Sequence, residues 1–304
     1  MTDYILTVAV SISSGVAQIT SAFPDLLPYK VEIALAFIGF MTLMNLRGVK
    51  ESGIAFAIPT YFFLGVTMLT IGIGYYQYFT GTLGTVTGVE PIHEATQGLT
   101  AFLILRAFSS GCTALTGVEA ISNGITAFKE PRSRNAGVTL IWMTAILSTI
   151  FFSVTFLSQS IGAVPSEVQT IFSQIGSIVY GAGSPLYLTL LGSTTLILVM
   201  AANTAYADFP RLAALHAGDG FLPKQLTYRG SRLVFSYGII VLAAVASLLV
   251  MVFQATTTAL IPLYAIGVFL SFTLSQTGMA LHLSLIHISE PTRRTPISYA
   301  VFCL

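Results

Sequence analysis

Charged side chains are scarce in this chain of 304 residues, because Asp, Glu, Lys and Arg together make up only 8% of it. Soluble domains carry roughly a quarter of charged residues, and the formal net charge here is only +1. With 54% hydrophobic residues and a mean hydropathy of +0.83, the composition excludes a soluble enzyme, a disordered chain and an electrostatic nucleic-acid binder. It predicts an integral protein of the lipid bilayer.

Cysteine is nearly absent as well, because Cys112 and Cys303 are the two that the sequence holds. Two isolated cysteines exclude a disulfide framework and a CxxC metal site. The sequence also lacks the HExxH, GxSxG and phosphate-binding-loop motifs, and no nucleophile–base pair is visible for an intramembrane enzyme. We therefore expect a protein that is not an enzyme and uses no cofactor.

Eight apolar stretches run along the chain, and most reach the roughly 20 residues that a helix needs to cross a bilayer. An unpaired backbone is too costly in lipid, so each stretch is predicted to be a helix; the short alternating segments of a β-barrel do not appear. The predicted fold class is therefore an all-α integral membrane protein, multi-pass in the cell membrane. The stretches are Tyr4–Ala22, Val31–Leu46, Ile54–Phe79, Thr100–Phe128, Val138–Ile161, Leu186–Asp208, Leu233–Val252 and Leu260–Leu281.

Basic residues in the connecting segments alternate along the chain. They follow the second, fourth and sixth stretches, whereas the segments after the third, fifth and seventh contain no Lys or Arg. The positive-inside rule places the even-numbered exits in the cytoplasm, so the first span runs outward. Lys30, on the outer side, is the exception. The cytoplasmic set is Arg47, Lys50, Lys129, Arg132, Arg134, Arg211, Lys224, Arg229 and Arg232.

A carboxylate, Glu119, lies near the middle of the fourth stretch among glycine and hydroxyl residues. An ionisable residue inside a span is costly and marks a functional site by default. Glycines weaken a helix, and transporters bind ions where a helix breaks near the membrane midplane. We therefore predict a break at Thr116–Glu119. The alternative is a straight helix whose glycines pack against its neighbours, with Glu119 paired to a partner.

A polar stripe follows one face of the first stretch. Its members are spaced four, four, three and four residues apart, which places them on one side of a helix. Such a stripe faces protein or water rather than lipid, so it either lines a permeation path or forms hydrogen bonds between helices. The stripe consists of Asp3, Thr7, Ser11, Ser14 and Gln18, with Tyr4 beside it, and the eighth stretch repeats the pattern more weakly with Tyr264, Gly267, Ser271 and Ser275.

The C-terminal residues 283–304 read LSLIHISEPTRRTPISYAVFCL. This string resembles the translation of a transposon-type sequencing adapter, in which LSLIHISEPTR corresponds to the mosaic end and its extension and ISYAVFCL to the flow-cell end. We therefore divide the chain into residues 1–282, an incomplete transmembrane transporter domain, and residues 283–304, a non-native tail. The alternative is a native amphipathic tail.

Five segments carry a resemblance to a known family. They read MTDYILTVAVSISSG, NLRGVKESG, AFSSGCTALTGVEAISNGITAFKEPRSRNA, LILVMAANTAYADFPRLA and IPLYAIGVFLSFTLSQTGM. They resemble the KimA-type potassium importers, which are grouped with the KUP potassium transporters in the amino acid–polyamine–organocation superfamily. The resemblance implies the inverted-repeat fold of the sodium-coupled amino acid transporters, with the eight stretches corresponding to the third to tenth of twelve spans.

The resemblance also implies a function and a site. The family consists of secondary active transporters that import potassium coupled to protons, and oxygen atoms replace the hydration shell of the ion. Hydroxyl and carbonyl oxygens suit a large monovalent ion, while carboxylates balance its charge and can carry a proton. The family pattern places potassium at Asp3, Tyr4, Thr7, Ser11, Thr116, Gly117, Glu119 and Tyr264.

Some parts of the family architecture have no counterpart in this sequence. These are the first two spans, which contribute a carboxylate and a tyrosine to the site, the last two spans, and the cytoplasmic domain on which a homodimer depends. We therefore expect the fragment as written to be inactive and its full-length parent to import potassium. The alternatives are an amino acid or amine permease of the same superfamily, with a half-helix facing the substrate carboxylate, and a structural membrane subunit.

Overall fold

The computed structural model describes residues 1–48, 53–89, 100–112, 128–228 and 235–289. Within these ranges every regular element is a helix. The longer ones are α1 (Thr2–Ala22), α2 (Lys30–Leu46), α3 (Gly53–Thr80), α4 (Ala101–Cys112), α6 (Arg132–Ser160), α7 (Ile171–Tyr180), α8 (Pro185–Gly218), α9 (Ser236–Val252) and α10 (Thr257–Ser289), with short 3-10 helices η1 (Pro24–Tyr29) and η4 (Lys224–Thr227).

Six helical segments in the described part of the chain are long and apolar enough to cross a membrane. They correspond to the first, second, third, fifth, sixth and eighth stretches predicted above. The seventh stretch forms α9, which is apolar but has 17 residues, and the fourth is described only as far as α4. The prediction of an all-α membrane protein is confirmed.

The chain divides into two compact units, each described here by itself. The first unit contains Met1–Gly98 and Ile150–Ile261, and the second contains Leu99–Thr149 and Pro262–Leu304. The second unit therefore holds α4, the first part of α6 and most of α10. The first unit contains α1 with its polar stripe.

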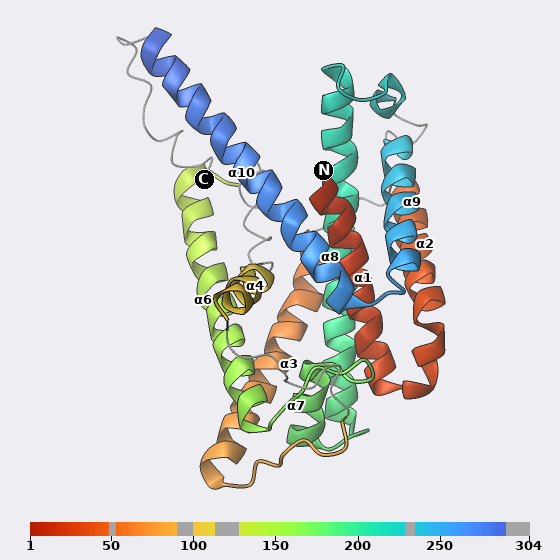
Figure 1. The fold of residues 1–304 in the computed structure, drawn as a ribbon, viewed down its shortest axis with the longest axis vertical. Helices are drawn as coiled ribbons and strands as arrows, with labels where there is room; N and C mark the ends of the chain where they lie inside the picture. Colours follow the sequence, from red (N-terminus) through yellow and green to blue (C-terminus); the bar gives the residue numbers. More distant parts are fainter. Residues whose placement is uncertain (49–52, 90–99, 113–127, 229–234, 290–304) are drawn as a thin grey trace. The chain divides into compact units, whose positions relative to one another are not determined.

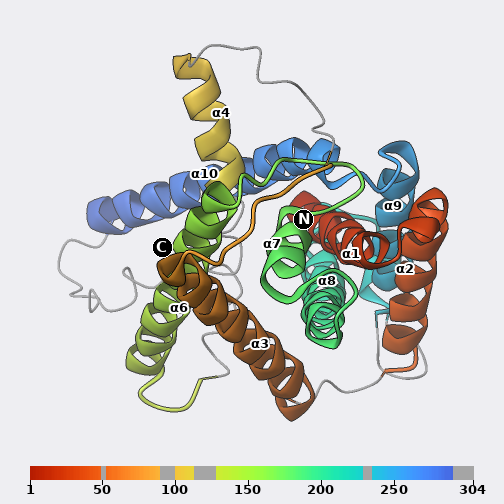
Figure 2. The same cartoon turned by 90° about the horizontal axis from the view of Figure 1, so that it is seen from below.

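Helices α1 and α8 form the centre of the first unit, with α2 and α9 beside them (Figures 1 and 2). Gly15 lies in the α1–α8 contact, where an added Cβ atom would be at ordinary van der Waals distance, 3.6 Å from the Cβ of Leu198. The carbonyl of Gly15 accepts a hydrogen bond from the Thr195 hydroxyl at 3.2 Å. Fully buried Val8 and Ile12 continue the apolar contact along α1, so the core lies on one side of this helix.

A second apolar cluster joins α3, the end of α6 and α7 around Leu157 and Ile161. Helix α7 lies in the segment after the fifth stretch, which the sequence analysis treats as a connection. It begins after Thr170, whose hydroxyl accepts a hydrogen bond from the Ser173 N–H at 3.1 Å and so caps the helix. It ends at Gly181, where φ is 87°, a conformation that favours glycine.

The segments predicted to lie outside gather at one end of the first unit. The Val86 N–H donates to the Ile161 carbonyl at 2.8 Å, which joins the connections after α3 and α6. The Thr170 N–H donates to the Ser21 hydroxyl at 3.0 Å, which joins the latter connection to the end of α1. Because these segments follow the first, third and fifth stretches, their clustering agrees with the topology inferred from charge.

Polar contacts join α2 and α8 in the half predicted to face the cytoplasm. The Asn45 amide donates to the Asn203 side-chain oxygen at 2.7 Å, and the hydroxyls of Thr42 and Tyr206 lie 3.0 Å apart. Hydrogen bonds between membrane helices contribute on average about 0.6 kcal/mol each. These two contacts therefore orient α2 against α8 while apolar packing supplies most of the attraction.

Helix α8 is longer than predicted, because it continues past Asp208 to Gly218. Pro210 lies inside this extension, where it removes one backbone donor. Gly238 of α9 packs directly on that proline: a Cβ atom at position 238 would lie 2.9 Å from both Cα and Cβ of Pro210. The α8–α9 contact therefore needs glycine at position 238.

We expect Gly238→Ala to destabilise the protein by about 1–3 kcal/mol, because the added methyl group overlaps the backbone of Pro210. The thermal midpoint of the detergent-solubilised protein, followed by size-exclusion chromatography after heating, measures this loss. Gly192→Ala is the matched control, because no atom lies within 4 Å of a Cβ at that helical position. Equal midpoints for the two variants would contradict the close α8–α9 contact.

Candidate functional site: a polar face and an outer pocket

Four of the predicted site residues lie together on α1. Asp3 is buried, with 5% of its surface exposed, whereas Tyr4, Thr7 and Ser11 are half-buried. At 100° per residue this face lies opposite the side of α1 that carries the apolar core. At 1.5 Å per residue the stripe spans about 22 Å from Asp3 to Gln18. The stripe from Asp3 to Gln18 is thus turned away from the apolar core of its own unit, whereas Tyr4 beside it packs against that core.

Asp3 is the charged end of this face. Its Oδ1 atom lies 3.1 Å from the N-terminal ammonium of Met1. Carboxylates are rare inside membrane spans, and a buried one needs a cation or hydrogen-bond donors to offset its loss of hydration. In this chain that cation is the N-terminal ammonium itself, two residues before Asp3.

At the outer end of α1 the polar face is bound by the connection before α7. The Gln18 side-chain oxygen accepts a hydrogen bond from the Thr170 hydroxyl at 3.0 Å. The Ser21 hydroxyl accepts one from the Thr170 N–H, and the Tyr187 hydroxyl donates to the Ser21 carbonyl at 3.2 Å. Gln18 and Ser21 are both at most 7% exposed. The outer part of the stripe therefore forms hydrogen bonds to another segment. This was the alternative to lining a permeation path.

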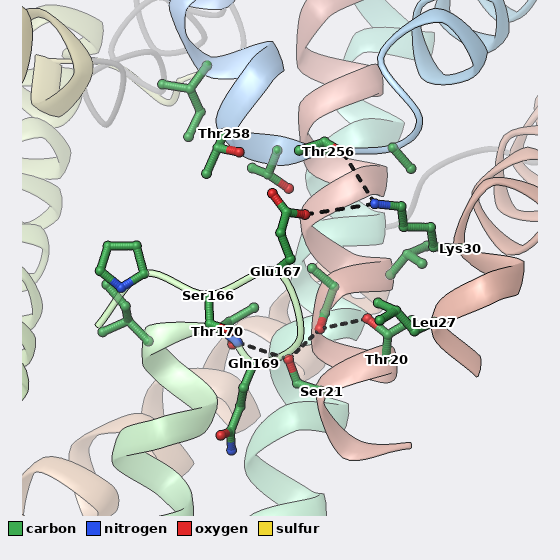
Figure 3. Close-up of a pocket in the computed structure, with 17 residues that line it drawn as sticks. Thr20, Ser21, Leu27, Lys30, Ser166, Glu167, Gln169, Thr170, Thr256 and Thr258 are labelled. Atoms are coloured by element: carbon green, nitrogen blue, oxygen red, sulfur yellow. Dashed lines mark hydrogen bonds and ion pairs between the residues drawn. The ribbon is translucent and has the colours of Figure 1, made fainter. Parts of the chain in front are cut away.

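A pocket of about 330 Å³ lies at this same end (Figure 3). Its walls come from the last turns of α1, the start of α2, the connection between α6 and α7, and the turn between α9 and α10. All four segments belong to the first unit and to the side that the charge pattern places outside. Besides Lys30 and Glu167, the pocket is lined by the hydroxyl residues Thr20, Ser21, Ser166, Thr170, Thr256 and Thr258.

Lys30 connects three walls of the pocket. Its ammonium donates a hydrogen bond to the Thr256 hydroxyl at 3.2 Å and lies 3.9 Å from a carboxylate oxygen of Glu167 (Figure 3). The charge pattern of the sequence marks Lys30 as the exception to the positive-inside rule, but it does not predict these partners. The lone positive charge on the outer side was a signal in the sequence that Lys30 has partners. It could not identify them, because Glu167 and Thr256 lie 137 and 226 positions later in the sequence.

The other predicted site residues lie outside the first unit or outside the described residues. Thr116, Gly117 and Glu119, with the predicted helix break, lie outside the described residues. Tyr264 lies in α10, in the second unit, and its distance from the α1 residues is not defined. Of the predicted potassium site, the structure of the first unit therefore describes Asp3, Tyr4, Thr7 and Ser11.

The described residues contain no group of three or more His, Cys, Asp or Glu side chains that lie together. Such groups hold transition metals. The oxygen atoms on α1 and around the pocket are instead hydroxyls, amides and single carboxylates, which suit a weakly held monovalent ion. The donor set of both places fits an alkali cation or an ammonium group.

The sequence matches known proteins along nearly its whole length. Potassium transporter KimA of Bacillus subtilis (strain 168) is 46% identical over 281 residues, which is 92% of this chain and 46% of that protein. The chain thus spans about half the length of this curated relative. The profile of the family described as "Amino acid permease" matches residues 1–292. With its apolar helices, the chain is therefore a multi-pass membrane protein that belongs to the amino acid permease family.

Proposed function

We propose that the protein is a secondary active transporter that imports potassium along the polar face of α1. The observation that carries this proposal is the buried carboxylate of Asp3 at one end of a row of half-buried hydroxyls. A carboxylate in a span is expensive unless a cation passes or binds there. The 46% identity to a protein named a potassium transporter supports potassium as that cation.

The contact at Asp3 suggests how a cation is held. In this chain the N-terminal ammonium of Met1 offsets the charge of the carboxylate at 3.1 Å. We expect the full-length parent to continue before Met1, and an amide would then replace the ammonium. The carboxylate would in that case need another monovalent cation, with Tyr4 and Thr7 supplying further oxygens in place of water.

Three further parts of the proposal rest on the resemblance alone. Transport is coupled to protons, carried by a carboxylate such as Glu119. Potassium also contacts Thr116, Gly117 and Tyr264. The full-length parent forms a homodimer. Separately, the resemblance to a sequencing adapter supports the division into residues 1–282 and a non-native tail, residues 283–304.

The test is potassium uptake by the protein encoded at the native locus, read past both ends of this sequence. The gene is expressed in cells whose own potassium importers are deleted, and growth and radioactive rubidium uptake are measured at low external potassium. We expect rescue of growth and a tracer uptake that potassium saturates and a protonophore abolishes. A correctly inserted protein that neither rescues growth nor takes up rubidium would overturn the proposal.

An amino acid or amine permease is the second candidate, because the matching family profile is that of amino acid permeases. The same cells distinguish the two. Competition of rubidium uptake by potassium but not by amino acids or primary amines supports potassium import. Uptake of a labelled amine or amino acid without rubidium uptake would support the second candidate instead.

A further inference from the structure

Lys30 is placed where a positive charge is unexpected. It begins α2 on the side that the charge pattern places outside, and it lines a pocket of about 330 Å³ with Glu167 and several hydroxyls. Its ammonium is 3.2 Å from the Thr256 hydroxyl and 3.9 Å from Glu167. The partners therefore surround Lys30 with a carboxylate and a hydroxyl oxygen, the atoms that would bind a monovalent cation.

We propose that this pocket is an extracellular site for a monovalent alkali cation, and that Lys30 is a built-in competitor for it. When the pocket is empty, the ammonium of Lys30 binds Glu167 and Thr256 and holds the outer segments together. An arriving cation takes the Glu167 carboxylate in place of the ammonium, and the segments separate. The identity of that cation as potassium rests on the proposed function above.

The strength of the Lys30 contacts suits such an exchange. At 3.9 Å, with side chains 26% and 49% exposed, the ion pair is long and partly hydrated. Exposed ion pairs contribute only about 0–1 kcal/mol, so thermal motion opens this one readily. A short, buried pair would instead cost several kcal/mol to separate. The ammonium can therefore yield Glu167 to an external cation and return after it leaves.

The pocket also holds oxygens that Lys30 does not use. Thr257 lines it, and the hydroxyl of this residue is buried without a hydrogen-bond partner in the described part of the chain. Ser166 and Thr258 line it on either side of Glu167 (Figure 3). A dehydrated alkali cation needs several oxygen ligands, and these hydroxyls can complete the set around the carboxylate.

The test measures how readily the pocket opens in the full-length protein in intact cells. Thr20 lines the pocket and is 3% exposed, so Thr20→Cys, in a background without other cysteines, reports opening to a membrane-impermeant thiol reagent. Potassium chloride is compared with N-methylglucamine chloride at equal ionic strength. We expect potassium to accelerate labelling by about two- to fivefold, the factor that corresponds to the upper half of the range for an exposed ion pair.

Two variants identify the groups involved. In Lys30→Gln we expect fast labelling in both salts, because the competitor is lost. In Glu167→Gln we expect no difference between the salts, because the cation has lost its ligand. Asp25→Cys is the matched control, since Asp25 is exposed on the same side outside the pocket lining, and its labelling should be equally fast in both salts.

Labelling of Thr20→Cys that is equal in the two salts, or that Lys30→Gln leaves slow, would overturn the proposal. Rubidium uptake by the parent protein is measured in the same cells. Uptake with salt-independent labelling would reject the outer cation site alone, whereas potassium-dependent labelling without uptake would reject the import function and leave the site standing.

Discussion

Asp3→Asn is expected to remove potassium uptake almost completely. The substitution keeps the size and hydrogen-bonding oxygen of a side chain that is 5% exposed but removes its charge. Two unit charges 4 Å apart attract by about 4 kcal/mol at an effective dielectric constant of about 20. Because about 1.4 kcal/mol changes an affinity tenfold, we expect the half-saturating potassium concentration to rise at least about a hundredfold.

Two comparisons separate the lost charge from a folding defect. Asp25→Asn makes the same chemical change at an exposed position of η1, and its uptake should equal that of the parent. Asp3→Glu keeps the charge and should retain measurable uptake. The measurement is the concentration dependence of rubidium uptake, normalised to surface expression. Parental uptake by Asp3→Asn would exclude Asp3 from the cation path.

The membrane helices were predictable because length and hydropathy alone define them. An apolar stretch of about 20 residues has few alternatives in lipid, and the boundaries of α1 and α2 match the prediction within a few residues. The end of α8 was wrong by ten residues, since the helix continues into polar sequence through Pro210. Hydropathy marks where a helix leaves the membrane, but it does not mark where the helix ends.

Helix α7 was missed because it is too short to cross a membrane and carries polar residues. Its apolar residues Ile171, Ile175 and Ile178 recur at helical spacing, and Thr170 is a typical N-cap. A search for short amphipathic helices would have found it. Its position against α1 depends on hydrogen bonds from Thr170 to Gln18 and Ser21, about 150 residues earlier, which no local pattern contains.

The polar stripe was predicted as a geometric feature, but its use is divided along α1. Near Asp3 the face is only half-buried and supports the proposed cation path. At Gln18 and Ser21 the same face binds the connection before α7. Spacing predicted that these residues share a side of one helix. It could not predict the partners, because those come from distant parts of the chain.

Gln174→Leu is expected to release the outer connection between α6 and α7. The Gln174 side chain is fully buried, at 0% exposed, and its amide makes three hydrogen bonds to this connection. It accepts one from the Val164 N–H at 3.1 Å and donates to the carbonyls of Val164 and Gln169 at 2.7 and 3.1 Å. Leucine has a similar size but leaves all three backbone groups without these partners.

Each buried polar group left without a partner costs about 1–3 kcal/mol, so local opening of this connection should become easier by about 3 kcal/mol. That change corresponds to about a hundredfold increase in the open fraction. Cleavage by a glutamate-specific protease, added outside intact cells, measures this open fraction, because Glu167 is the single glutamate between positions 162 and 185. We expect cleavage at Glu167 to accelerate by a similar factor, and the additional substitution Glu167→Gln to remove that product.

Gln159→Leu is the matched control, because Gln159 is exposed near the end of α6 and the same change there should leave the cleavage rate unaltered. Similar cleavage rates for the two leucine variants would mean that apolar packing of α7 against α3 and α6 holds the connection without the amide. The expected difference would instead identify Gln174 as the group that positions Glu167 at the pocket. In that case Gln174→Leu should also abolish the potassium dependence of labelling at Thr20→Cys, although it removes no atom that lines the pocket.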